Sequence, residues 1–168
     1  MKTEVVKDLT FVRDLVSQVQ DPEVPVLTIA DLGILRSVTE DNGFFHISIT
    51  PTFTGCPAMR AIENEIASML SSAGISNFKI STIISPAWST DWMSEEGKRK
   101  LKEYGIAPPS QSTEEHLRAL ISGSKQPVAC PFCNSTNTRL TSPFGSTACK
   151  ALHYCDGCHQ PFEEFKCH

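Results

Sequence analysis

Apolar residues near the start of the chain recur with the spacing of one helix face. They step by four, three, four and three residues through Val5, Leu9, Val12, Val16 and Val19. This spacing predicts an amphipathic helix over residues 5–19. Asp21-Pro22 follows, and because proline disfavours helical geometry at the residue before it, we expect the helix to end there.

Residues 34–50 have the pattern of a β-hairpin. Residues 34–39 and 44–50 are typical of strands, and the Asn42-Gly43 pair between them favours a tight turn because both positions tolerate positive φ. A loop then leads to a second helix, which we expect to begin at Pro57 and to end at Gly74. The apolar face of this helix carries Met59, Ile62, Ile66 and Met69.

The remaining pattern divides the chain into two parts. A third strand over residues 77–84 and a short charged helix over residues 94–104 complete the first part. Pro108-Pro109 and Ser122-Gly123-Ser124 indicate a linker. We therefore predict an α+β fold, with a small three-stranded sheet and helices over residues 1–107. A linker would cover residues 108–127, and a cysteine-rich tail residues 128–168.

Composition narrows the class of protein. The 168 residues include 15 Lys plus Arg against 19 Asp plus Glu, for a formal net charge of -4. This balance excludes a wholly basic nucleic-acid binder, although a local basic patch remains open. The charged N-terminus is unlike a signal peptide, and no apolar run approaches the ~20 residues of a membrane span. We expect a cytoplasmic protein, and in that reducing compartment clustered cysteines usually bind metal.

Six of the seven cysteines lie in the tail. Two Cys-x-x-Cys pairs there, Cys130 with Cys133 and Cys155 with Cys158, can supply four thiolates to one tetrahedral zinc ion. An iron–sulfur site, a redox pair or free thiols are the alternatives. The other nearby candidates are left out of the ligand set: Cys149, Cys167, His153, His159 and His168.

The lone Cys56 stands just before Pro57, at the predicted start of a helix. Unpaired N–H groups and the positive end of the helix dipole would stabilise a thiolate there, so Cys56 is a candidate reactive or metal-contacting thiol. The alternative is an inert, buried cysteine. Asp21, Glu23 and Asp31 lie on loops and could belong to a site or simply cap the chain.

Two tryptophans flank an acidic residue after the third predicted strand. Trp88, Asp91 and Trp92 could form an exposed docking patch. Such aromatic residues are more often part of a core.

Several motifs resemble known families. Asp21-Pro22-Glu23-Val24-Pro25, Asp31-Leu32-Gly33 and Thr54-Gly55-Cys56-Pro57 resemble the SufT-like family of iron–sulfur assembly domains. The tail motifs, together with Trp88-Ser89-Thr90-Asp91-Trp92, are similar to the PaaD-like family of bacterial phenylacetate-degradation proteins. Tyr154 and Gln160 depart from that pattern, but neither is a proposed zinc ligand.

The resemblance implies an accessory protein rather than an enzyme. PaaD-like proteins support the multicomponent oxygenase that converts phenylacetyl-CoA to its ring-1,2-epoxide. Other subunits of that system hold the di-iron centre and the flavin and [2Fe–2S] reductase. The implied role is to help assemble or insert one of the metal centres, either the reductase cluster or the di-iron site. We therefore expect structural zinc and a transient iron or iron–sulfur cargo. The expected partners are the oxygenase and reductase subunits and the iron–sulfur assembly machinery, with no nucleic acid and no membrane.

Two other functions are less favoured by the residues. A nucleic-acid-binding zinc ribbon would need a basic tail, but Arg139, Lys150 and Lys166 are balanced by three acidic residues. A catalytic subunit with Cys56 as nucleophile would need a base, and neither His46 nor His116 is obviously placed for that role.

Overall fold

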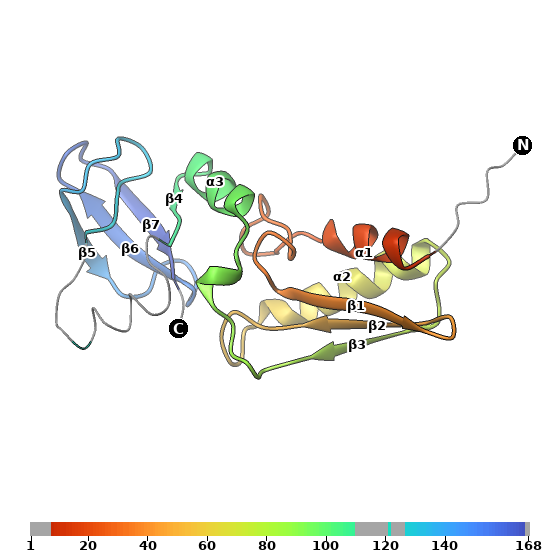
Figure 1. The fold of residues 1–168 in the computed structure, drawn as a ribbon. Coiled ribbons are helices and arrows are strands. Elements are labelled where there is room, and N and C mark those ends of the chain that lie inside the picture. Colours follow the sequence, from red (N-terminus) through yellow and green to blue (C-terminus); the bar gives the residue numbers. More distant parts are fainter. Residues whose placement is uncertain (1–7, 110–120, 122–126, 167–168) are drawn as a thin grey trace, which may run out of the picture. The chain divides into compact units, whose positions relative to one another are not determined.

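The computed structural model describes residues 8–109, 121 and 127–166. The chain divides into two compact units, Met1–Ala87 and Trp88–His168. The predicted α+β class is confirmed, with a three-stranded sheet in the first unit and a four-stranded sheet in the second (Figure 1). Among the described residues, no helix is long and apolar enough to span a membrane.

The first unit is a sheet covered by two helices on one face (Figure 1). Helix α1 (Leu9–Ser17) is shorter than the predicted 5–19 segment, because Asp8 caps it by accepting the Phe11 N–H at 2.8 Å. Residues 1–7 lie outside the described residues. Helix α2 (Ala58–Ser72) is capped by Ala73 and followed by Gly74, whose φ of 69° gives the left-handed stop expected from the sequence.

The sheet has the strand order β1-β2-β3. Strands β1 (Leu35–Asp41) and β2 (Phe44–Ile49) form the predicted hairpin, with positive φ at Asn42 and Gly43. Strand β3 (Phe78–Thr82) returns through α2 and pairs with β2 in parallel. The core between helices and sheet consists of Val12, Val16, Val38, Ile47, Ile49, Ile62, Ile66 and Leu70.

The second unit is a β-ribbon extended by the segment that precedes it. Strands β5 (Thr138–Ser142), β6 (Lys150–Cys155) and β7 (Pro161–Phe165) are antiparallel neighbours. Strand β4 (Ile106–Ala107) adds to β7 in parallel. The 3-10 turn η1 (Thr90–Trp92) and helix α3 (Glu95–Glu103), capped by Ser94, precede β4.

Residues 88–107 therefore pack with the ribbon, whereas we expected the first domain to continue to residue 107. Trp88 packs edge-on against Phe165, with ring centroids 6.1 Å apart. Gly105, which follows α3 with a φ of 88°, lies so close to the Phe132 ring that a Cβ would meet it at 3.0 Å. The two-residue strand β4 was too short to predict from the sequence. Most of the expected linker, residues 108–127, lies outside the described residues.

We predict that Phe165→Ala destabilises the second unit by about 3–5 kcal/mol, because it removes a buried ring that packs on Trp88. The two tryptophans of the chain, Trp88 and Trp92, both belong to this unit. Tryptophan fluorescence during denaturant unfolding therefore measures it selectively. The matched control is Ile66→Ala in the first unit. It should lower the denaturant midpoint of the helical circular-dichroism transition and leave the midpoint of the fluorescence transition unchanged.

Candidate metal centre and thiol site

Two turns of the same construction hold four cysteines at one end of the ribbon. In the first, the Asn134 N–H donates to the Cys130 carbonyl at 2.9 Å, and Asn134 adopts a φ of 61°. In the second, the His159 N–H donates to the Cys155 carbonyl at 2.8 Å, and His159 adopts a φ of 60°. Each turn therefore bends the chain back after a Cys-x-x-Cys pair and directs both sulfurs inward.

The sulfur atoms of Cys130, Cys133, Cys155 and Cys158 all lie within 4.8 Å of one another. The Cys130–Cys158 sulfur distance is 3.7 Å and the Cys133–Cys155 distance is 3.6 Å. A tetrahedron with zinc–sulfur bonds of about 2.3 Å has edges of ~3.8 Å. The four residues therefore fit one zinc ion, and when bound it would cross-link the two turns.

The thiols of the site differ in acidity: burial and hydrogen bonds with Cys133 and Cys155 raise the pKa of the Cys158 thiol to about 12, whereas the pKa of the Cys155 thiol is lowered. Burial raises the pKa of the Cys155 thiol, but the N–H groups of Cys158 and Gly157 donate to its sulfur and lower the pKa to about 7. Metal ligation requires the thiolate, so these backbone donors prepare Cys155 to bind.

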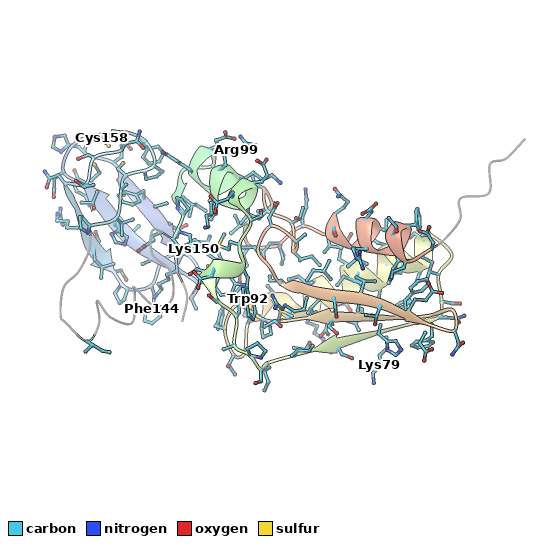
Figure 2. All side chains as sticks on the ribbon, in the orientation of Figure 1. Lys79, Trp92, Arg99, Phe144, Lys150 and Cys158 are labelled. Atoms are coloured by element: carbon cyan, nitrogen blue, oxygen red, sulfur yellow. The ribbon has the colours of Figure 1, made fainter. Side chains whose placement is uncertain are left out.

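The other tail candidates do not join the four-cysteine cluster. His153 shares a hydrogen bond of 2.9 Å with Glu164 and stacks on Phe162. Cys149 is buried beside the Thr147 hydroxyl at 3.1 Å. It directly precedes Lys150, which Figure 2 shows, with Phe144, at the other end of the ribbon from Cys158. Cys167 and His168 lie outside the described residues.

The lone Cys56 lies at the head of α2 in the first unit, in an acidic environment. Burial raises the pKa of its thiol, and the nearby carboxylates of Glu23 and Asp21 raise it further. Hydrogen bonds with the Ala58 backbone and the Thr52 side chain act in the opposite direction but do not compensate. Our expectation of a stabilised thiolate therefore fails, because burial and nearby negative charge outweigh the helix terminus.

The structure brings Asp21 and Glu23 to this thiol and gives Asp21 a structural role as well. One carboxylate oxygen of Asp21 accepts the N–H groups of Glu23 and Val24, each at 2.8 Å. Asp31 is paired with Thr28 through reciprocal hydrogen bonds of 3.1 Å, which close the next turn of the loop. Asp31 therefore acts as a loop cap.

The structure does not present Trp88, Asp91 and Trp92 together as one exposed patch. Trp88 is buried against Phe165, so it cannot form an exposed docking surface. Asp91 is exposed and accepts the Ser89 hydroxyl at 2.9 Å, while Trp92 is half-buried.

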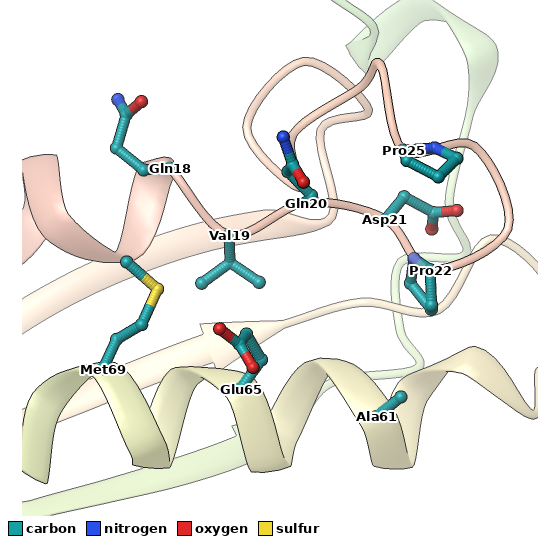
Figure 3. A pocket seen from close by; sticks show the side chains of 9 residues that line it. All are labelled: Gln18, Val19, Gln20, Asp21, Pro22, Pro25, Ala61, Glu65 and Met69. Carbon is teal, nitrogen blue, oxygen red and sulfur yellow. The ribbon is translucent and has the colours of Figure 1, made fainter.

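A groove of about 470 Å³ lies beside α2 in the first unit (Figure 3). One wall is the segment Gln18–Pro22 with Pro25, and the other is a single face of α2 formed by Ala61, Glu65 and Met69. No sequence motif indicated this groove, because its walls come from segments far apart in the chain.

The fold and these sites define a protein with two modules, an iron–sulfur assembly module and a four-cysteine zinc ribbon. Residues 10–75 match the model of the family described as "Iron-sulfur cluster assembly protein". Residues 114–166 match the "PaaD zinc beta ribbon domain". The two matches fall in different structural units.

Nearly the whole chain is similar to a protein of Escherichia coli K12 that is named as a subunit of "Putative 1,2-phenylacetyl-CoA epoxidase". The two are 45% identical over 154 residues, which cover 91% of this chain and 89% of the relative. The chain therefore belongs to the PaaD family, which includes this epoxidase subunit, as its motifs indicated.

Two further relatives match about half of the chain. A "Fe-S protein maturation auxiliary factor" of Porphyromonas gingivalis is 35% identical, over 49% of this chain and 80% of the relative. A solved domain of unknown function from Bacillus anthracis is 28% identical with a TM-score of 0.52, over 55% of this chain and 90% of that domain.

We predict that the purified chain binds one zinc ion and that Cys155→Ser loses it, because three thiolates leave the tetrahedron open. Elemental analysis of anaerobically purified protein measures this directly. Cys149→Ser, outside the cluster, is the matched control and should keep its zinc. Equal zinc loss in both variants would contradict the assignment.

We predict that Cys56 reacts slowly with iodoacetamide at neutral pH, because its raised pKa leaves little thiolate. Glu23→Gln should lower the midpoint of the pH–rate profile, since it removes a negative charge near the sulfur. Thr52→Val should raise it, since it removes a hydrogen bond that stabilises the thiolate. Mass spectrometry of the Cys56 peptide separates this thiol from the others, and shifts of the same sign in both variants would refute the electrostatic account.

Proposed function

We propose that this protein is an accessory maturation factor of the phenylacetyl-CoA epoxidase system. In that role it would help an iron–sulfur or di-iron centre of a partner subunit to assemble. The proposal is supported by the names of the E. coli and P. gingivalis relatives, one an epoxidase subunit and the other an Fe–S protein maturation factor. This chain carries both corresponding modules.

The single observation that carries the proposal is the position of Cys56. It lies in the matched assembly module, half-exposed, next to the carboxylates of Asp21 and Glu23. In the resting protein, burial and these carboxylates keep the thiol protonated. A ferrous ion, as cargo, would replace that proton: the sulfur–iron bond forms, the S–H bond breaks, and the proton leaves to solvent. The negative charge that disfavours the bare thiolate would then favour the bound cation.

The environment of Cys56 argues against a catalytic subunit. A nucleophilic cysteine needs a lowered pKa or a paired base, whereas burial and two carboxylates raise the pKa of Cys56. We therefore propose that the protein has no catalytic residue of its own.

The tail also offers little to nucleic acid. Each of its three basic residues has an intramolecular partner: Arg139 contacts Asp156, Lys150 contacts Glu163, and Lys166 lies over the Phe144 ring. We propose that the ribbon recognises a protein, with the oxygenase and reductase subunits as its partners. The set of free thiols suits the reducing cytoplasm, where we expect the protein to act.

We predict that Cys56→Ser leaves the fold and the zinc content intact but lowers the iron content of the reductase or oxygenase subunit produced with it. The reason is that a serine hydroxyl is a poor iron ligand at neutral pH. Cys149→Ser, which alters a thiol of the other unit, is the control. Iron and sulfide analysis of the purified partner measures the effect. Full iron occupancy with Cys56→Ser would show that the thiol is not the carrier.

A further inference from the structure

The groove beside α2 runs toward Cys56. Ala61, Glu65 and Met69 are spaced four residues apart along one face of the helix that begins just after Cys56. Asp21, in the opposite wall, is close enough to Cys56 for its charge to act on the thiol. In Figure 3, Glu65 and Met69 rise from α2 toward the segment that carries Gln18 and Val19. The wall that carries Asp21 is thus the part of the groove nearest in effect to the proposed cargo thiol, which does not itself line the groove.

The lining combines apolar walls with negative charge. Pro22, Pro25 and Met69 supply accessible apolar surface and Glu65 an exposed carboxylate, while the buried carboxylate of Asp21 adds a second negative charge to the wall. None of the lining residues is basic. Its volume of about 470 Å³ exceeds what a metal ion needs, and proline and methionine walls are poor ligands for hard cations. The complementary occupant is therefore a chain segment that is both apolar and positively charged.

We propose that the groove binds a short extended segment of the client protein that carries lysine or arginine, and so brings the client's metal ligands to Cys56. The identity of the client rests on the proposed function, but the binding chemistry does not. A basic side chain of the segment would meet the exposed Glu65 and be attracted by the charge of Asp21, while its apolar side chains would pack against Pro22, Pro25 and Met69.

The test is an NMR titration of the full chain with acetyl-Ala-Lys-Leu-Lys-Ala-amide and, separately, with acetyl-Ala-Glu-Leu-Glu-Ala-amide. We expect the basic peptide to shift amide signals in residues 18–25 and 61–69, and the acidic peptide to leave them unchanged. Shifts spread over other acidic surfaces, or equal effects of both peptides, would overturn the proposal.

Charge-matched variants separate the groove from general electrostatic attraction. Glu65→Gln and Asn64→Lys each add one positive unit on exposed positions of α2, but Asn64 does not line the groove. Glu65→Gln should weaken peptide binding about two- to fivefold, as expected for one exposed ion pair, and Asn64→Lys should have a smaller effect. Equal weakening by both contradicts a defined groove. Ala61→Trp should block binding by filling the groove, and unchanged binding there counts against it too.

The test of peptide binding in the groove and the test of the proposed carrier role of Cys56 can fail independently. Cys56→Ser should bind the basic peptide normally, because the thiol does not line the groove. If Cys56→Ser fails to load the client yet no peptide binds the groove, the carrier role stands and this inference is wrong. If the groove binds but Cys56→Ser loads the client normally, the groove stands and the carrier role is wrong.

Discussion

The fold of the second unit depends on how the negative charge of four cysteine sulfurs is neutralised, because these sulfurs lie within 4.8 Å of one another. Four thiolates at that spacing repel strongly unless a divalent cation lies among them. The apolar cluster beside them is small: Ala107, Val128, Cys130, Cys155 and Phe162. Cys130 and Cys155 belong both to this cluster and to the four cysteines that fit a zinc ion, so the candidate metal centre and the core share residues. Residues 88–107 extend it, since Phe132 of the first cysteine turn rests on Gly105 and Ala107 joins the cluster.

The first unit has no such dependence. Its sheet is covered by α1 and α2, and its core is built from aliphatic side chains of both helices and from the inward positions of the central strand. A module that folds on its own apolar burial can leave a thiol at its surface for exchange rather than for structure. The four-cysteine cluster and the lone Cys56 therefore lie in units whose folds depend on different interactions.

Local rules explain what the sequence could predict. The Asn42-Gly43 hairpin, the Gly74 helix stop and the four-cysteine cluster each follow from short motifs, and all three have the predicted form. The features that the sequence could not predict depend on contacts between segments far apart in the chain. Strand β4 exists only because β7 pairs with it, and the groove needs loop 18–25 beside α2. The direction of the pKa shift of Cys56 was predicted with the wrong sign, because tertiary packing buries the thiol and brings the charges of Glu23 and Asp21, distant in sequence, to act on it.

The thiols of Cys155 and Cys56 show how the surroundings of a cysteine set its pKa and so its competition between proton and metal. At Cys155, hydrogen bonds to the sulfur lower the pKa to about 7, so a thiolate is available there, whereas burial and neighbouring thiols raise the pKa of Cys158 in the same cluster to about 12. At Cys56, burial and carboxylates raise the pKa, so any bound cation competes with a tightly held proton. Because a proton must leave before a cation can bind the sulfur, a raised pKa weakens the binding of metal to a thiol. The same residue type therefore differs in acidity between the two units because hydrogen-bond donors surround the Cys155 sulfur, whereas burial and nearby carboxylates dominate at Cys56.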